Sequence, residues 1–417
     1  METPKFPKTF FWGSGTSAHQ VEGSTYNDWS EWEHEHAKRL AEGAQQRYGH
    51  LASWERIKLQ ATNPLNYISG QAADHYHRFE EDFTTAKSLG HNAHRFSIEW
   101  SRIEPHEGKF DEAAIEHYRQ VIAALRERNL EPFVCLWHWT IPVWLRDKGG
   151  VESGEFGKYF ARYVHVIAGS LKNDVRYWLT LNEPTSVIGH SYFNGHWPPQ
   201  KKSWRAALRV YHVLADAHAR AYKVLHALDP DAQVGFTNIM AFIEPARDTL
   251  LDRLAARIRD FVSNQYFLKL TGTNTHDFYA LQYYFHWRLR FPGKPDNENK
   301  LVNDMGWEVY QEGLYHLLKR LSVYKKPIYI TENGIADARD TYRARFLEDA
   351  VFWMKKAMAE GVDLRGYFHW SLLDNFEWSD GLWPRFGLVE VDYTNQQRKI
   401  RPSAFAYKKI IEDETQK

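Results

Sequence analysis

Short apolar runs alternate with amphipathic segments along most of the chain. Eight runs consist mainly of apolar side chains and are bounded by polar residues, glycine or proline. Most are apolar on both faces, which is typical of strands that lie between two layers. The eight predicted strands are residues 9–17, 92–98, 131–138, 176–183, 233–240, 277–284, 327–333 and 364–371.

A segment with helical spacing follows each predicted strand. In residues 76–89, for example, Phe79, Phe83, Ala86 and Leu89 fall on one helical face. The predicted helices are residues 76–89, 111–128, 154–171, 203–228, 248–270, 308–322, 342–360 and 402–413.

This repeated strand–helix order predicts an α/β fold, a single (β/α)8 TIM barrel. An open doubly wound sheet is the alternative. No linker rich in Gly, Ser or Pro divides the chain, so we expect residues 1–417 to form one domain. Two insertions interrupt the pattern, and we expect an irregular segment near 36–72 and an exposed loop near 291–304.

Composition narrows the possible partners and the compartment. The chain has 53 basic and 53 acidic residues, so no global charge favours binding to nucleic acid or to an anionic membrane. Its start lacks the pattern of a signal peptide, and no apolar run reaches the roughly 20 residues of a membrane helix. The single cysteine, Cys135, excludes an intrachain disulfide. We therefore predict a cytoplasmic protein.

Polar and aromatic residues stand where the predicted strands end. In a TIM barrel, the carboxyl ends of all strands meet at one mouth, where active sites are built. Residues remote in sequence are therefore expected to converge there. They are Gln20 and Glu22, Arg95, His138, Asn182 and Glu183, Tyr283 and Tyr284, Glu332 and Asn333, and Trp370.

Glu183 and Glu332, from the fourth and seventh predicted strands, would face each other across this mouth. A pair of carboxyl groups on either side of one bond is what glycoside hydrolysis requires, and in the retaining reaction they lie about 5–5.5 Å apart. Two carboxyl groups this close do not both ionise readily, so one keeps its proton near neutral pH. The plainer alternative for each glutamate is a helix cap or a surface ion pair.

Several motifs occur in an order that is typical of one enzyme family. They are "FFWGSGTSAHQVEG", "RFSIEWSRIEP", "WHW", "TLNEP", "GWEVYQEGL", "ITENG", "HWSLLDNFEW" and "RFGLVEVDY". With these motifs the sequence resembles glycoside hydrolase family 1, the retaining β-glycosidases, from about Phe6 to Tyr407.

The resemblance implies a role for each matching residue. Glu183 corresponds to the general acid/base and Glu332 to the nucleophile, with Arg95 and Tyr284 as partners of the nucleophile. The residues implied in substrate binding are Gln20, His138, Asn182, Tyr284, Trp307, Trp370, Glu377, Trp378 and Phe386. Of these, Trp307 is implied on the aglycone side of the site, and Trp370 is implied as the platform under the sugar.

Plainer interpretations stay open for some of these residues. Arg95 would also fit an ion pair in the barrel core, His138 a hydrogen-bonded core histidine and Trp370 core filling. Gln20 and Glu377 would also fit contacts with backbone groups near the rim.

The implied activity is hydrolysis of terminal non-reducing β-D-glucosyl, galactosyl or fucosyl residues of a small β-glycoside or oligosaccharide. The resemblance implies no cofactor. We also expect no metal, because "EHEH" (33–36) and "HYH" (75–77) lack a helical i, i+4 histidine pair with a third ligand. The sugar preferred, the natural aglycone, the balance with transglycosylation and the oligomeric state are left open.

Two other functions are weighed against this one. A 6-phospho-β-glycosidase of the same family would lack the Glu377–Trp378 pair, because a carboxylate there repels a 6-phosphate. A sugar-binding relative without catalysis would lack one of the two glutamates. The sequence departs from the usual family pattern at Gln282, where Asn is common, and at Val151, where an aromatic residue is common.

Overall fold

The computed structural model describes residues 5–415 and contains a closed barrel of eight parallel strands. The strand order is β5-β4-β3-β2-β1-β9-β8-β6, and pairing of β5 with β6 closes the ring. The fold is therefore the predicted (β/α)8 barrel, and the open sheet is excluded. The strands are β1 (Phe11–Gly15), β2 (Ala93–Ser97), β3 (Glu131–Cys135), β4 (Tyr177–Asn182), β5 (Gln233–Pro245), β6 (Tyr279–Arg290), β8 (Ile328–Asn333) and β9 (Leu364–Trp370).

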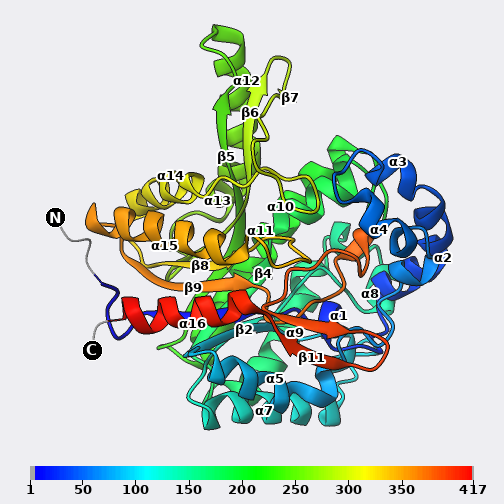
Figure 1. The fold of residues 1–417 in the computed structure, drawn as a ribbon. Coiled ribbons are helices and arrows are strands. Elements are labelled where there is room, and N and C mark those ends of the chain that lie inside the picture. The colour runs from blue at the N-terminus through cyan, green and yellow to red at the C-terminus, as the bar shows by residue number, and fades with distance from the viewer. Residues whose placement is uncertain (1–4, 416–417) are drawn as a thin grey trace.

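Helices cover the outside of the barrel, as Figure 1 shows. Seven of the predicted helices occur as single helices within a few residues of the expected bounds, and the predicted helix 248–270 is divided into α12, a π-helical turn and α13. These helices are α5 (His75–Ser88), α7 (Glu112–Glu127), α9 (Phe156–Leu171), α11 (Trp204–Leu228), α12 (Leu250–Asp260), α13 (Tyr266–Thr271), α14 (Glu312–Leu321), α15 (Arg343–Ala359) and α16 (Pro402–Glu414).

Large side chains fill the barrel interior away from the mouth. Phe133 stacks on Tyr177 with ring centroids 4.3 Å apart, and Tyr329 and Phe368 pack against Phe133. All four rings belong to one cluster inside the barrel. The interior is a packed core rather than a pore, so a site can form only at the carboxyl ends of the strands.

The first insertion is mostly helical, so the prediction of an irregular segment at 36–72 is wrong. It contains the end of α2 (Asp28–Glu42), α3 (Ala44–Tyr48), α4 (Trp54–Ala61) and the 3₁₀ turn η1 (Pro64–Tyr67). Asn27 caps α2 by accepting a hydrogen bond from the backbone of Ser30. The short helices pack with Trp383 in a separate apolar cluster, which gives them the tertiary support that short helices need.

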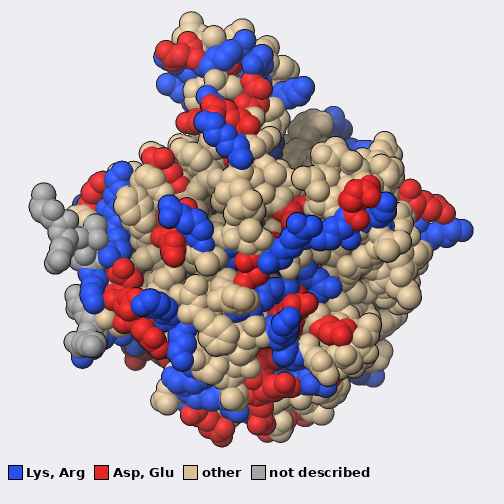
Figure 2. All heavy atoms as spheres, viewed as in Figure 1, with Lys and Arg blue, Asp and Glu red and all other residues tan. Residues whose placement is uncertain are grey.

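Two strands are longer than predicted and form an arm. β5 continues to Pro245 and β6 to Arg290, and together with α12 and β7 (Lys294–Pro295) they project from the barrel (Figure 1). The predicted end of the sixth strand at Tyr284 is therefore wrong. Segment 291–304 contains β7 and is largely exposed. Figure 2 shows acidic and basic side chains interspersed over this arm.

Short elements complete the described residues. They are α1 (Ala18–Val21), α6 (Trp100–Ile103), α8 (Val143–Asp147), η2 (Gly150–Glu152), α10 (Pro184–Val187), η3 (Ile188–Phe193), η4 (Phe261–Gln265), η5 (Ser322–Tyr324), η6 (Trp378–Asp380), β10 (Val389–Asp392) and β11 (Gln397–Ile400). Among residues 5–415, no helix has the length and apolar character needed to cross a membrane.

Candidate active site

A cavity of about 640 Å³ opens at the carboxyl ends of the barrel strands. Apart from Arg95, all the residues named as site candidates from the family motifs line it: Gln20, His138, Asn182, Glu183, Tyr284, Trp307, Glu332, Trp370, Glu377, Trp378 and Phe386. Two of them do not lie at a strand end, where they were expected. Gln20 lies in α1 rather than at the end of β1, and Tyr284 lies within β6 rather than at its end.

Glu332 lies near the end of β8 and accepts hydrogen bonds from three side chains. The guanidinium of Arg95 and the amide Nε2 of Gln282 donate to its Oε1, the latter over 2.6 Å. The hydroxyl of Tyr284 donates to Oε2 over 2.7 Å. Removal from water raises the pKa of Glu332, while the charge of Arg95 and the bond from Tyr284 oppose that rise. These contacts favour the ionised form.

Arg95 lies beneath the cavity floor and is fully buried in β2. Besides Glu332, it donates to the side-chain oxygen of Asn182 over 2.5 Å. Arg95 thus forms a buried ion pair, as the plainer interpretation allows, but its partner is the carboxylate at the cavity floor. Its guanidinium joins Glu332 to the residue that precedes Glu183.

Glu183 has a different environment. It follows β4 with φ 41°, in the left-handed region, where the chain turns from the strand into α10. Its only side-chain hydrogen bond among the described residues comes from Ser186, which donates over 2.8 Å. Burial, followed by the negative charge of Glu332, raises the pKa of Glu183 to about 8. A carboxyl group in this position keeps its proton near neutral pH.

A hydrogen bond between Asn182 and His138 orients both side chains. Arg95, Thr237 and Gln282 all donate to the side-chain oxygen of Asn182, so its amide nitrogen points toward Nε2 of His138, 3.0 Å away. Because that nitrogen is a donor, His138 accepts at Nε2 and carries its proton on Nδ1. This Nδ1 is buried and has no hydrogen-bond partner among the described residues.

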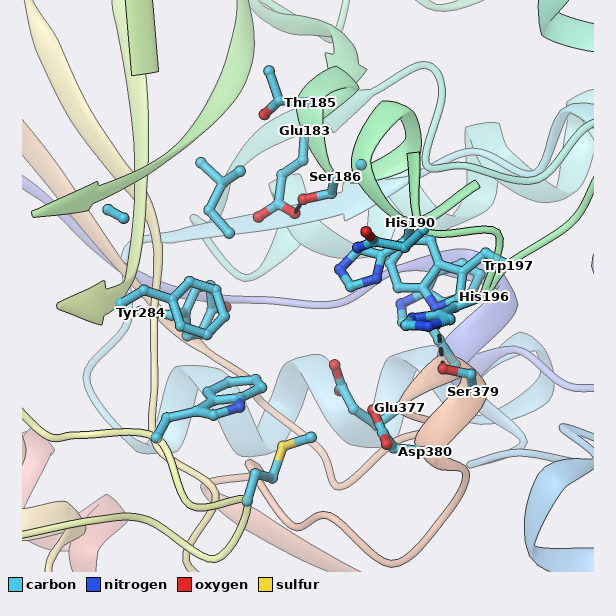
Figure 3. A pocket seen from close by; sticks show the side chains of 18 of the residues that line it. Glu183, Thr185, Ser186, His190, His196, Trp197, Tyr284, Glu377, Ser379 and Asp380 are labelled. Atoms are coloured by element: carbon cyan, nitrogen blue, oxygen red, sulfur yellow. Dashed lines mark hydrogen bonds between the residues drawn. The ribbon is translucent and has the colours of Figure 1, made fainter. Parts of the chain in front are cut away.

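Glu377 enters the cavity across from Glu183, as Figure 3 shows. The only hydrogen-bond contact of its carboxyl group with the described residues is Nε2 of Gln20 at 3.5 Å, so the carboxyl group is free to bind a ligand. Gln20 itself is held by Ser17, Asn375 and the backbone of Phe376. Burial, followed by the charge of Asp380, raises the pKa of Glu377 well above its ordinary value.

Aromatic rings form the walls around these polar groups. His138 stacks between Trp378 and Trp370, with interplanar angles of 11° and 23°. Trp370 is only 4% exposed, yet it lines the cavity, so it is not merely core filling. Phe386 and Trp307 lie with Trp370 in one apolar cluster.

Sequence reasoning did not select two further residues in this site. Gln282 was noted only as a departure from the family pattern, yet it touches both Glu332 and Asn182. Trp139, in the "WHW" motif, lines the cavity and donates from Nε1 to the backbone oxygen of Asn182 over 2.9 Å. The position of Trp139 beside His138 in that motif was a usable signal for it, whereas the contacts of Gln282 depend on the barrel's register.

Within residues 5–415, no group of three or more His, Cys, Asp and Glu side chains is placed to hold a metal ion. One histidine of each His-rich segment contacts a residue that does not suggest a metal site. His36 stacks on Trp32 with centroids 4.7 Å apart, and His75 contacts Asp82 at 2.8 Å.

A family model described as glycosyl hydrolase family 1 matches residues 2–286 and 290–416. The chain belongs to glycosyl hydrolase family 1. It is therefore a glycoside hydrolase, and the family inferred from its motifs is confirmed. The match spans both glutamates and nearly the whole arm.

Relatives within glycosyl hydrolase family 1 match over almost their full length. The chain is 33% identical to beta-glucosidase A of Thermotoga maritima, over 99% of each chain. Its structure is similar to the beta-glycosidase from Pyrococcus horikoshii, with a TM-score of 0.86, 35% identity, and 98% and 95% of the two chains covered. It is also similar to the Thermotoga maritima beta-glucosidase in complex with glucoimidazole, with a TM-score of 0.87, 31% identity, and 99% and 100% covered.

Proposed function

We propose that this enzyme is a retaining β-glycosidase that removes terminal non-reducing β-D-glucosyl residues by double displacement. The observation that carries the proposal is the contrast between two buried carboxyl groups on one cavity. Glu332 has a cation and two further donors on its oxygens, while Glu183 has no cation in contact and the charge of Glu332 adds to the burial that raises its pKa. This difference suits one group to act as nucleophile and the other as acid.

In the first step, an oxygen of Glu332 attacks the anomeric carbon while Glu183 gives its proton to the departing oxygen. The bond to the aglycone breaks, and a covalent glycosyl ester on Glu332 forms. Neutralising Glu332 removes the charge that raised the pKa of Glu183. The pKa of Glu183 then falls, so the group becomes a base.

In the second step, Glu183 takes a proton from water, and the resulting hydroxide attacks the anomeric carbon from the face the aglycone left. The ester bond breaks, Glu332 recovers its charge, and the sugar leaves with its β configuration. This geometry requires the two carboxyl groups to lie about 5–5.5 Å apart. A sugar acceptor in place of water would give transglycosylation from the same ester.

The proposed sugar contacts follow from the free polar atoms. The ring of His138 and the carboxyl group of Glu377, which both line the cavity, bind sugar hydroxyls, while Trp370 lies under the sugar ring. Asn182 has one remaining amide hydrogen for the 2-hydroxyl, where contacts strengthen as the ring gains oxocarbenium character. The names of the relatives, beta-glucosidase A and, at 30% identity in Sulfolobus acidocaldarius, beta-galactosidase, support a β-glycoside with a glucosyl or galactosyl unit.

The test is a panel of aryl β-glucoside, β-galactoside, β-fucoside and 6-phospho-β-glucoside, with the first-formed product followed by NMR. We expect turnover of the β-glucoside and initial release of the β-anomer. Initial release of the α-anomer would contradict the retaining pair. Exclusive turnover of the 6-phosphoglucoside would support the 6-phospho alternative, and no turnover of any member would support a sugar-binding protein without catalysis.

A further inference from the structure

The cavity has an outer part that the proposed reaction does not use. From Tyr284, which contacts the proposed nucleophile, a row of aromatic rings leads toward the arm. The ring centroids of Tyr284 and Trp307 lie 6.2 Å apart. Those of Trp307 and Phe285 lie 4.8 Å apart, and those of Phe285 and Trp287 lie 5.6 Å apart. All four rings line the same cavity.

This aromatic row ends in a cation. The guanidinium carbon of Arg259, from α12, lies 4.7 Å from the centroid of Trp287, and Arg259 also lines the cavity. No carboxylate among the described residues lies within 4 Å of its nitrogens, and the only ionisable group that acts on its charge is Tyr211. The neighbouring Asp260 pairs instead with Arg320.

The two ends of the cavity therefore carry different ionisable groups. Four acidic side chains line it, Glu183, Glu332, Glu377 and Asp380, and the other cation in its lining, Arg47, is paired with Asp380 at 2.9 Å. Arg259 is the one unpaired Lys or Arg among the lining residues, all of which are described. An elongated ligand in this cavity meets acidic groups at its sugar end and a free cation beyond the aromatic row.

The chemistry of Arg259 suits it to bind a carboxylate. A guanidinium that stacks on an indole by its flat face keeps the N–H donors along its edge free. A carboxylate can accept two of these bonds in parallel, which makes the contact selective for planar anions.

We propose that Arg259 selects β-glycosides whose aglycone carries a carboxylate at its far end, beyond two or three ring-sized units. The rings of Trp307, Phe285 and Trp287 bind the intervening sugar or aromatic units. This inference rests on the proposed function, because it assumes that the terminal sugar is cleaved at Glu183 and Glu332.

The experiment compares cello-oligosaccharides of two, three and four units with their aldonic acids, in which C1 of the reducing end is oxidised to a carboxylate. The readout is the ratio of kcat/KM for the acid to kcat/KM for its neutral partner. We expect a ratio at or below one for the shortest pair, where the carboxylate lies near the acidic end. For a longer pair we expect a preference of about three- to tenfold for the acid, which 0.5 M NaCl reduces toward one.

Two variants isolate the cation. Arg259→Gln is expected to abolish the preference for the longer acid. Arg257→Gln, an exposed residue of the same helix that does not line the cavity, is expected to keep it. The proposal would be overturned if the ratio of kcat/KM for acid to neutral substrate never exceeded one. It would also be overturned if 0.5 M NaCl left a preference unchanged, or if Arg259→Gln kept it. Failure to release glucose from the neutral series would instead count against the proposed function, and the acid preference would fall with it.

Discussion

The floor and the outer wall of the cavity differ in the contacts that surround their ionisable groups. On the floor, ionisable groups are removed from water, and each is surrounded by contacts that set its charge. Arg95, Gln282 and Tyr284 surround Glu332, whereas Glu183 has only Ser186. On the outer wall, flat rings present apolar surface, and Arg259 has no carboxylate partner among residues 5–415.

This difference indicates that catalysis depends on the floor of the cavity and that substrate selectivity depends on its outer wall. Groups that exchange charge during a reaction must be held in fixed positions before substrate arrives. Groups that sort substrates need only complement them, and they act through binding rather than through the chemical step. Substitutions on the floor should therefore change kcat strongly, and substitutions on the wall should change kcat/KM modestly and only for some substrates.

The largest effect is expected from Glu332→Gln. Gln has the same shape but cannot form the glycosyl ester, so kcat on an aryl β-glucoside should fall by about 10⁴ or more. Glu390→Gln, an exposed position on β10, serves as the control and should leave kcat unchanged. Hydrolysis by Glu332→Gln at the parental rate would show that the floor does not supply the nucleophile.

A smaller and substrate-dependent effect is expected from Glu183→Gln. Loss of the acid should lower kcat/KM by about 10²–10⁴ for a glycoside with a poor leaving group. For a dinitrophenyl glycoside the loss should be much smaller, because this leaving group departs without a proton. The measurement compares kcat/KM for a dinitrophenyl glucoside with kcat/KM for an alkyl glucoside. Equal losses on both substrates would contradict an acid role.

Tyr284→Phe should lower the rate by an intermediate amount and should also shift the pH profile of kcat/KM. Loss of a hydrogen bond to a charged group corresponds to about ten- to hundredfold in rate. The bond lowers the pKa of Glu332, so its removal raises that pKa. Because activity requires ionised Glu332, the acidic limb of the kcat/KM profile should move to higher pH. The alkaline limb, set by deprotonation of Glu183, should stay near pH 8. A loss of rate with an unmoved acidic limb would mean that Tyr284 is structural only.

The smallest effect is expected on the wall, from Trp287→Ala. Removing one stacked ring should lower kcat/KM for a cellotetraose-length substrate by about two- to tenfold. For an aryl glucoside with a single-ring aglycone, kcat/KM should stay within about twofold. Equal effects on the long and short substrates would show that Trp287 supports the fold or the floor rather than an outer subsite.

The sequence predicted the barrel better than the arm, for a physical reason. A strand such as β3 is apolar on both faces, so its pattern is distinct from that of the helices around it. Past Tyr284, β6 continues as "FHWRLR", which alternates apolar and polar side chains. The pattern of this run has the period of a strand, but the prediction of the sixth strand ended before it, at Tyr284.

The site residues in the family motifs could be predicted from the sequence, but the residues that contact them could not. Glu183 and Glu332 stand at strand ends, where polar residues are conspicuous. Gln282 contacts Glu332 only because β6 and β8 pair with a register shift at that level. Arg259 lies on a helix of the arm, and its place over Trp287 follows from packing that no local pattern encodes.

The most direct test of the central claim is mass spectrometry of the enzyme during turnover of a 2-deoxy-2-fluoro-β-glucoside with an activated leaving group. Fluorine at C2 slows both steps by destabilising the positive charge on the ring, and the activated leaving group restores only the first. The account predicts that protein mass rises by one fluoroglycosyl unit and that the label lies on the peptide containing Glu332. An unmodified protein that still releases the leaving group, or a label on any other residue, would contradict it.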